Sequence, residues 1–365
     1  MADLTGINTN SYGYDELAKK YYDFYAPAFK VKVEGTDLLQ EGMEISALTV
    51  DTSVNKADSF SFVVNNAFDI VQKDFKWLTE YLEVGKEIQI EMGYTDKLET
   101  VLYGYITAVR IHLPLEEIPT VTVEGMDYSF KMMSGAKSRS WVKVKHSELV
   151  AEIGGEYGLT TSVESTTVTY DIVEQSRVSD YEFLCWLADK NHFELFVNGK
   201  TLCFRKPHSD IAELITLVWG KTLLSMDKHI DLADQLNSVT ASSWDPATQE
   251  TIREEAKTID KLGFSRAGNH FLNSAGLSKV EHIYLQAKAS NEVLAEAKAV
   301  LNKQGMKLVS GNAVSLGIPE IRAGRYIMLE GLGSALNGVY YVPEATHTID
   351  ESGYTTAFNI GGNAI

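Results

Sequence analysis

The spacing of hydrophobic and polar residues divides the chain into segments with two different periods. From Phe29 apolar and polar residues alternate, and the same alternation returns in four later segments up to Val123. Alternation puts every second side chain on one face of a strand, so each segment predicts a half-buried β-strand. The positions that define the pattern are Phe29, Val31, Val33, Phe60, Phe62, Val64, Ile88, Ile90, Met92, Val101, Tyr103, Tyr105, Thr107, Val109, Ile111, Val121 and Val123. With turn residues between them, they indicate an antiparallel sandwich or barrel over 25–137.

Residues 138–206 have a helical period and predict a small α/β unit. Ser147 can cap a helix with the body ELVAEIGGEYG. Ser179 and Glu182, three residues later, form a capping box for a second helix through YEFLCWLADKN. The segments FELFV and TLCFR then flank Asn198-Gly199, a pair that suits the positive φ angles of a type I′ turn. The unit should therefore end in a β-hairpin.

The pattern after Pro207 predicts strands that are interrupted by a polar excursion. Strand patterns resume after Pro207 in LITLVWG and SVTASSW and then give way to a charged stretch over 245–275. That stretch has few large apolar residues, so we expect an excursion or mobile loop that only a partner would order and a protease would cut first. A helix is predicted from Ser290 to Gly305, followed by short strands. The polar N-terminus predicts an arm with one short amphipathic helix.

Two segments far apart in the sequence share one order of residue types. The segments VGKEIQIEMGY at 84–94 and AGRYIMLEGLG at 323–333 both contain Gly, a basic residue, any residue, Ile, any residue, an apolar residue and Glu, in that order. A hairpin and further strands are predicted after each, so both halves look like versions of one barrel. Chance similarity between two β-sandwiches is the alternative.

Composition and charge limit the classes of function. Fifty acidic and 33 basic residues among 365 give a formal net charge of −17, which opposes binding to a nucleic-acid backbone. The two cysteines, Cys185 and Cys203, stand in apolar stretches without metal-ligand spacing, so we expect reduced thiols buried in a core. The N-terminus has no signal-peptide pattern and no apolar run reaches about 18 residues, so the expectation is assembly in the bacterial cytoplasm without direct membrane insertion.

Candidate chemistry is sparse, and we predict no catalytic, cofactor-binding or metal-binding residue. His208-Ser209-Asp210 has the residue types of a catalytic triad, but neighbours on an extended chain point to alternate faces. The glycine-rich stretch 331–338 lies between predicted strands, which favours a hairpin connection over a phosphate-binding loop. The pairs Glu116-Glu117 and Glu254-Glu255 suit solvated loop charges better than a glycosidase site.

Three stretches make the sequence recognisable by resemblance. The segment VSDYEFL, continuing through LADKN to FELFVNGKTLCF, the segment DLADQLNSVTASSWDPATQE, and the region from LAEAKAVLNKQ to TTAFNI are similar to the phage late control gene D protein family. Members of that family are hub proteins of contractile tails and resemble the hub portion of VgrG-type spikes. The likeness covers about two thirds of the chain. His192 departs from it, because the family often has glycine at that position.

The resemblance implies a mainly β fold with an α+β insertion: two tandem tube-like antiparallel β-barrel domains and a small α/β domain. The expected organisation is an N-terminal arm at 1–24, a first barrel at 25–137, an inserted α/β domain at 138–206, and a second barrel at 207–365. The polar and helical excursion at about 245–304 interrupts the second barrel. The expected assembly is a homotrimer.

The expected function is that of a structural baseplate hub in a phage tail or a phage-tail-like contractile injection particle. The resemblance implies that a trimer binds the hexameric tail tube on one face, the trimeric spike on the other, and further baseplate proteins around it. The location implied is the virion or particle. Two alternatives stay open: a receptor- or glycan-binding tail protein that uses exposed aromatic residues, and a cell-wall hydrolase.

Overall fold

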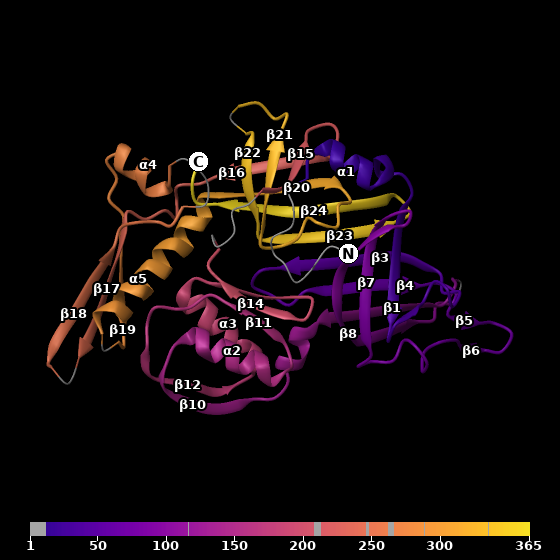
Figure 1. The fold of residues 1–365 in the computed structure, drawn as a ribbon, viewed down its shortest axis with the longest axis horizontal. Helices are drawn as coiled ribbons and strands as arrows, with labels where there is room; N and C mark the ends of the chain where they lie inside the picture. Colours follow the sequence, from indigo (N-terminus) through magenta and orange to yellow (C-terminus); the bar gives the residue numbers. More distant parts are fainter. Residues whose placement is uncertain are drawn as a thin grey trace.

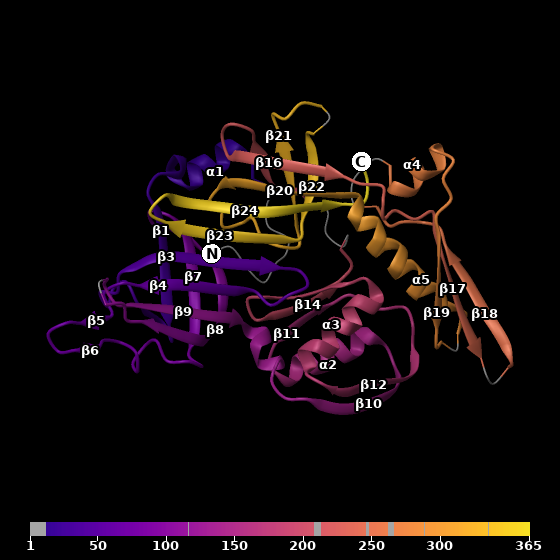
Figure 2. The same ribbon diagram turned by 180° about the vertical axis from the view of Figure 1, so that it is seen from behind.

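A computed structural model of the protein describes residues 12–115, 117–207, 213–245, 248–261, 266–287, 289–334 and 336–365. The fold is mainly β, as predicted, and 14 strands belong to one sheet. Figures 1 and 2 show this sheet through the body of the molecule, with the helices of an α/β unit below it and a separate strand-and-helix insert at one end.

The first repeat is a six-stranded antiparallel array with the order β3-β4-β9-β8-β7-β1. Its strands are β1 (Pro27–Val33), β3 (Ile45–Ser53), β4 (Ser59–Val64), β7 (Glu87–Tyr94), β8 (Lys97–His112) and β9 (Thr120–Asp127). The short strands β2 (Thr36–Asp37), β5 (Phe68–Asp69) and β6 (Asp74–Phe75) lie in its connections. All five strands predicted from alternation are present. In β4 every second side chain is buried, so the period seen in the sequence is the burial pattern of the strand.

The second repeat has the same strand order, β16-β20-β24-β23/β22-β21-β15. Its strands are β15 (Glu213–Val218), β16 (Leu223–Ile230), β20 (Val309–Leu316), β21 (Arg325–Glu330), β22 (Gly338–Val342), β23 (Glu344–Asp350) and β24 (Gly353–Gly362). The two segments compared in the sequence form β7 and β21, which occupy equivalent positions. The internal similarity therefore has a counterpart in topology.

The two repeats are joined edge to edge, and the expectation of two closed barrels is not confirmed. Strand β23 pairs with β3 from Glu344 opposite Ser53 to Ile349 opposite Leu48. This pairing makes one open sheet out of both repeats, with β23, β24 and β3 side by side in Figure 1. One continuous hydrophobic core lies against both, and it includes Val50 and Phe62 from the first repeat and Ile327 and Phe358 from the second.

The α/β unit carries the predicted helices and hairpin. It contains β10 (Lys137–Val144), α2 (His146–Glu156), β11 (Thr160–Val163), β12 (Tyr170–Val178), α3 (Asp180–Asn191), β13 (Glu194–Asn198) and β14 (Thr201–Arg205). Short 3-10 turn η2 (Tyr128–Met132) leads into it. The capping box of Ser179 and Glu182 is present at α3. In contrast, Lys145 and not Ser147 is the N-cap of α2, because the Ser147 hydroxyl instead accepts the backbone N–H of Thr166 at 3.1 Å.

The predicted hairpin is confirmed, but its turn is displaced by one residue. Asn198 pairs directly with Thr201, so the two connecting residues are Gly199 and Lys200. Only Gly199 has positive φ, at 63°. The predicted type I′ turn over Asn198-Gly199 is therefore wrong, since Asn198 still belongs to the strand and only one residue needs the left-handed region.

The charged stretch 245–275 was expected to be a mobile loop, and this is wrong for its described residues. It contributes β18 (Glu250–Ala256) and α4 (Gly268–Ser274) to an insert that also contains β17 (Ser238–Asp245), β19 (Val280–Leu285) and α5 (Ser290–Gly305). Strand β18 pairs with β17, and α5 covers one face of the sheet. Among the described residues of this stretch, Ala256, Ile259, Ala267 and Leu272 are buried and supply its share of the core. The helix predicted from Ser290 to Gly305 is confirmed, and η3 (Met306–Leu308) follows it.

The N-terminal segment packs on the second repeat. The predicted short helix is α1 (Tyr14–Lys20), followed by the 3-10 turn η1 (Tyr22–Phe24). Leu17 and Tyr21 are fully buried in the common core. The backbone N–H of Thr216 in β15 donates to the carbonyl of Tyr12 at 3.0 Å. The described part of the arm is therefore a docked element of the fold.

Candidate functional site

Several strand edges of the large sheet lack a neighbouring strand in the described part of the chain, and two of them are related through the repeat. The first is the distal half of β8, residues 107–112, which pairs with β9 on one side but lies beyond the last β7 pairing at Tyr105. The second is β16, which pairs with β20 on one side. Apolar side chains are exposed at both, with Ile111 on β8 and Leu224 and Ile230 on β16. Open edges with exposed apolar residues are natural sites for pairing with another chain.

The internal β23–β3 contact shows what such an edge can bind. In the second repeat β22 pairs with β21, and after Pro343 the chain continues as β23, whose outer edge takes up β3. In the first repeat the single strand β8 corresponds to both β22 and β23. Its residues up to Tyr105 pair with β7, and the chain bulges between Ile106 and Ala108. Residues 107–112 are therefore equivalent to β23, and β16 is equivalent to β3. The two open edges have the same relation as the two strands that pair inside the chain.

A buried charge cluster holds the two repeats together beside this contact. Arg322, from the loop before β21, donates to an Asp58 carboxylate oxygen of the β3–β4 connection at 3.3 Å. Asp127, at the end of β9, accepts the backbone N–H of Asp58 at 3.1 Å and that of Ser129 at 2.9 Å. Asp58, Asp127 and Arg322 are 4%, 3% and 6% exposed, so this is a core site with two acids and one base.

Burial dominates the electrostatics of this cluster. Loss of solvent and the neighbouring Asp127 charge raise the pKa of Asp58 to about 8, although Arg322 opposes the shift. Burial also raises the pKa of Asp127 to about 6, against the hydrogen bonds from Ser129. Burial lowers the pKa of Arg322 as well. Each charged form is thus disfavoured by desolvation, which is the usual situation of a buried ion pair.

A second buried link connects the α/β unit to the second repeat. Arg205 on β14 donates to Glu194 on β13 at 3.1 Å and also to the Gly324 carbonyl, while the Tyr341 hydroxyl donates to the other Glu194 oxygen. Burial raises the pKa of Glu194 to about 7, with Arg205 opposing the shift. These contacts fix the hairpin of the α/β unit against β22.

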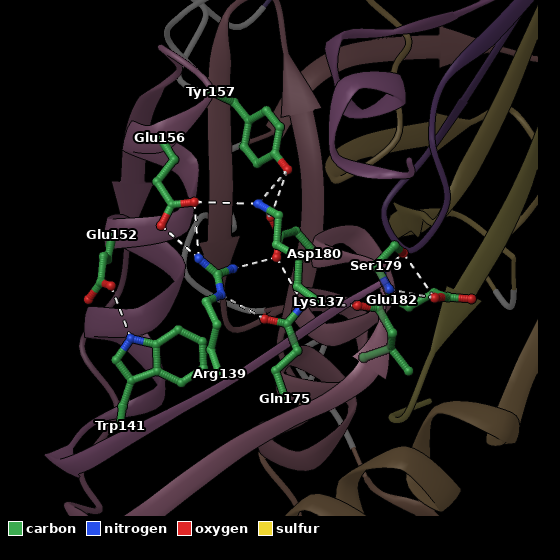
Figure 3. Close-up of polar contacts among 11 residues, drawn as sticks. Lys137, Arg139, Trp141, Glu152, Glu156, Tyr157, Gln175, Ser179, Asp180 and Glu182 are labelled. Atoms are coloured by element: carbon green, nitrogen blue, oxygen red, sulfur yellow. Dashed lines mark hydrogen bonds and ion pairs between the residues drawn. The ribbon is translucent and has the colours of Figure 1, made fainter. Parts of the chain in front are cut away.

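Inside the α/β unit, Asp180 is the centre of a polar network (Figure 3). Its carboxylate accepts from Lys137 at 2.6 Å, Tyr157 at 2.6 Å and Gln175 at 2.9 Å, and from Arg139. Burial alone would raise the pKa of Asp180, but these donors lower it overall. Because four donors from β10, β12 and the C-cap of α2 occupy the carboxylate, the network fixes the start of α3, and Asp180 is not presented to a substrate.

A cavity of about 750 Å³ lies where the α/β unit, the insert and the second repeat meet. Its walls are mostly apolar and include Ala188, Phe193, Met306 and Ile360. Among its charged lining residues, Asp189 pairs with Lys303 and Glu194 pairs with Arg205. Because these charges are neutralised in pairs, the cavity presents no reactive constellation.

The residues weighed as catalytic candidates are described only in part. His208-Ser209-Asp210 and Glu116 lie outside the described residues. The stretch 331–338 connects β21 to β22, which confirms the predicted hairpin connection. Glu254 accepts from Ser290 and Glu255 pairs with Lys257 at 2.8 Å, and as neighbours on β18 they point to opposite faces.

Both cysteines are free thiols. Cys203 is buried as predicted, whereas Cys185 is only partly buried. Burial raises the pKa of both thiols, that of Cys203 to about 11. A thiol with a raised pKa is a poor nucleophile at neutral pH.

Sequence reasoning missed the charge cluster and the β16 edge. Nothing in the sequence marks Asp58, Asp127 and Arg322 as partners, because they are brought together only by the pairing of distant strands. Strand β16, with the sequence LLSMDKHI, alternates weakly and three of its residues are charged or titratable. Its equivalence to β3, a strand also missed, would have been visible only with the repeat aligned strand by strand.

Two kinds of feature are absent from the described residues: a membrane-spanning helix and a metal-binding cluster. No helix there is long and apolar enough to cross a membrane. No group of three or more His, Cys, Asp or Glu side chains there has an arrangement that could hold a metal ion.

Solved structures with the same fold come from phage tails and a secretion system. A 43 kDa tail protein of prophage MuSo2 from Shewanella oneidensis is 12% identical and covers 92% of this chain and 98% of its own, with a TM-score of 0.70. A tail protein from Neisseria meningitidis is 13% identical, with coverages of 92% and 97% and a TM-score of 0.67. A component of the E. coli type VI secretion system is 10% identical, with coverages of 91% and 76% and a TM-score of 0.59. At these identities the likeness establishes the fold.

Comparison by sequence gives a different family from the one the resemblance suggested. No curated protein matches the chain. Membership of the late control gene D family is not confirmed, because the family model that matches, over residues 25–351, is another one. That match spans the first repeat, the α/β unit, the insert and the second repeat up to β23. The chain belongs to the family described as the Alg8 N-terminal domain.

Proposed function

We propose that this chain is the structural baseplate hub of a phage tail or phage-tail-like contractile injection particle, similar in role to late control gene D proteins. As a homotrimer it adapts the hexameric tail tube to the trimeric spike, within a baseplate of further proteins. The observation that carries the proposal is the arrangement of two topologically equivalent repeats, joined through β23 and β3, with an equivalent pair of edges left open.

The open edges supply a specific way to assemble. If residues 107–112 of one copy pair with β16 of the next, the contact repeats the internal one between β23 and β3. Every repeat in the ring then has the same neighbours, whether the junction lies within a chain or between chains. This heterologous contact closes into a ring if the rotation per repeat is right. Three chains give six repeats, which is the number that a tube ring of six subunits requires.

The fold likeness supports a role in a tail particle. The first two structures described above are tail proteins, and the third belongs to a secretion system and is itself similar in structure to tail proteins of bacteriophage T4. We therefore assign the protein to the virion or particle, after assembly in the bacterial cytoplasm. We assign no catalytic activity, since the buried acids Asp58, Asp180 and Glu194 each serve to connect elements of the fold.

An imaging reconstruction of the particle tests the proposal directly. The expected result is three copies of this chain around a channel, with both repeats of each copy facing the lumen. Six copies per ring would contradict it, and so would a channel lined by one repeat per chain.

A pair of variants tests the edge contact in the same reconstruction. Ile111→Lys places a charge on the open β8 edge, and charged residues on an edge prevent strand pairing. Val142→Lys places the same charge on exposed β10 of the α/β unit, away from both edges. We expect Ile111→Lys to abolish incorporation into particles while the monomer stays folded, and Val142→Lys to assemble normally. Normal assembly of Ile111→Lys would show that β8 is not the contact.

A further inference from the structure

The sheet of the insert has one covered face and one open face. Helix α5 packs on the face that carries Val239 and Ala241, and Figures 1 and 2 show α5 between this sheet and the rest of the molecule. Side chains alternate along a strand, so the intervening residues of β17, β18 and β19 point away from α5. We call this outward side the outer face.

The strand register fixes which residues are neighbours on the outer face. One row across the sheet contains Glu255, Thr240 and His282, and the next contains Arg253, Ser242 and Tyr284. The third contains Thr251 and Trp244. Rows two residues apart are separated by about 6.6 Å, so the face runs about 13 Å from Thr240 to Trp244.

Two aromatic rings dominate one end of this face. Trp244 is 58% exposed and Tyr284 is 86% exposed, although large aromatic side chains are usually buried. They stand on the adjacent strands β17 and β19, in neighbouring rows. A flat aromatic surface held by a sheet is therefore presented to solvent.

The other end of the face is a polar hollow. An open cavity of about 480 Å³ is lined by Thr240, Arg253, Glu255, Val280, His282 and the edge residue Glu254. The guanidinium offers several donors in a fixed plane, the carboxylate accepts, and the threonine hydroxyl does both. Donors and acceptors thus stand within two rows of the aromatic rings.

We propose that the outer face of the insert binds a saccharide chain built of pyranose rings. A pyranose has an apolar C–H face that can lie against an aromatic ring and a rim of hydroxyl groups that require donors and acceptors. Trp244 and Tyr284 supply the stacking surface, and Arg253, Glu255 and His282 supply the hydrogen bonds to an adjoining sugar. This is a binding activity separate from the hub role.

The composition of the face favours a saccharide over a macromolecule of another class. The cores of protein interfaces are depleted in charged residues, whereas here the rings adjoin Arg253 and the hydroxyls of Ser242 and Thr251. Aliphatic residues are nearly absent from the face, with Val280 at its end. Nucleic acid is disfavoured by the net charge of −17.

Binding of the purified full-length chain to an array of oligosaccharides tests the proposal. The probes include β-linked N-acetylglucosamine tetramers and neutral hexose tetramers, and the best one is titrated by calorimetry. We expect saturable binding that weakens about tenfold in Trp244→Ala and further in Trp244→Ala/Tyr284→Ala. Trp219→Ala removes a tryptophan of similar exposure from the second repeat and should leave binding unchanged. Thermal melting confirms that each variant is folded.

Three outcomes would overturn the proposal. The first is that the protein binds no saccharide on the array. The second is that the double variant binds with unchanged affinity. The third is strong protection of Trp244 from oxidative footprinting in assembled particles, which would mean that a protein partner covers the face. Because the array uses the isolated chain, failure there leaves the hub proposal untouched, and failure to find a trimer leaves this one untouched.

Discussion

The two repeats have one strand order but differ in what is attached to it. The connection between β3 and β4 takes only residues 54–58, whereas the equivalent connection between β16 and β20 takes residues 231–308 and holds the whole insert. Strand β1 runs antiparallel to β7, while β15 runs parallel to β21. The framework of paired strands is therefore retained where it forms the core, and the connections vary where they reach the surface.

The clearest difference concerns the outer edge of one equivalent strand. In the second repeat β23 pairs with β3, whereas in the first repeat the distal half of β8 has no such neighbour among the described residues. A single chain thus contains one complete junction and the two halves of another. The isolated chain therefore lacks the same kind of neighbour at the distal half of β8 and at β16.

The largest expected effect comes from breaking the junction that is complete. Arg322→Met leaves the buried acids Asp58 and Asp127 without their cation, and loss of one partner of a buried pair costs about 3–5 kcal/mol. We expect this loss in the free energy of unfolding, measured by urea denaturation. Because both repeats share one core, the transition should stay single.

The control for Arg322 is an exposed ion pair across the same junction. Lys56 and Glu344 are 2.9 Å apart and well exposed, so Lys56→Met should cost less than about 1 kcal/mol. A similar, small loss in both variants would show that the buried cluster does not hold the repeats together.

A smaller effect tests whether the repeats are equally well packed. Each has a glycine against an aromatic ring: a Cβ on Gly125 would lie 2.4 Å from the Phe60 ring, and one on Gly317 would lie 2.0 Å from the Tyr354 ring. Overpacking of this kind costs about 1–3 kcal/mol, so Gly125→Ala and Gly317→Ala should both destabilise the protein. Denaturation curves measure both.

Gly155 on α2 serves as the matched glycine. A Cβ there meets nothing within 4 Å, so Gly155→Ala should stabilise the protein by about 0.5–1 kcal/mol through helix propensity. A loss confined to one of the two variants Gly125→Ala and Gly317→Ala would show that the repeats are not equally tightly packed around these two glycines.

The fold was more accessible to sequence reasoning than the site. Alternation identified β4 and β7 because one face of each is buried and the other is not. It missed β3, where the third buried position is the polar residue Thr52, and β16, where exposed residues alternate poorly. The prediction of closed barrels failed because the hydrophobic pattern shows which face of a strand is buried but not which strand edges pair with each other.

The buried charges illustrate the same limit. Asp58 and Arg322 are 264 positions apart, and each alone reads as an ordinary charged residue. Asp180 was correctly placed at the start of a helix, but its role depends on Lys137, Arg139 and Gln175 from two other strands. Local signals predict caps and periods, whereas charge pairing depends on tertiary contacts.

The pH dependence of stability should report on the same cluster. Burial raises the pKa of Asp58 to about 8 and that of Glu194 to about 7, so the folded protein keeps protons that the unfolded chain releases above about pH 4. Their stabilising contribution is complete below pH 4 and is lost as the pH rises to 8. We expect the free energy of unfolding to fall by about 2 kcal/mol between pH 6.5 and 8.

Buried histidines change the free energy of unfolding in the opposite direction, and mainly at lower pH. Burial lowers the pKa of His347 to about 3 and that of His146 to about 4, so they reduce stability as the pH falls below about 6.5. Over pH 6.5–8 the opposing contribution of the histidines is smaller than that of the acids, because the unfolded histidines are already at least half neutral at pH 6.5. Asp58→Asn should flatten the slope there. A wild-type protein whose stability is constant or rises over this interval would contradict the assignment.

The smallest expected effect concerns Pro343, which separates β22 from β23 where the first repeat has the continuous 16-residue strand β8. Because β8 changes partners at a bulge without a proline, we infer that the neighbouring strands cause the bend, and that Pro343 only restricts the unfolded chain. Its carbonyl accepts the Val54 N–H at 3.2 Å, a bond that any residue could make. Pro343→Ala should therefore cost only about 0.4–1 kcal/mol in urea denaturation, with the amides of β23 as protected from hydrogen exchange as before. A larger loss, with deprotection of β23, would make the proline the cause of the bend.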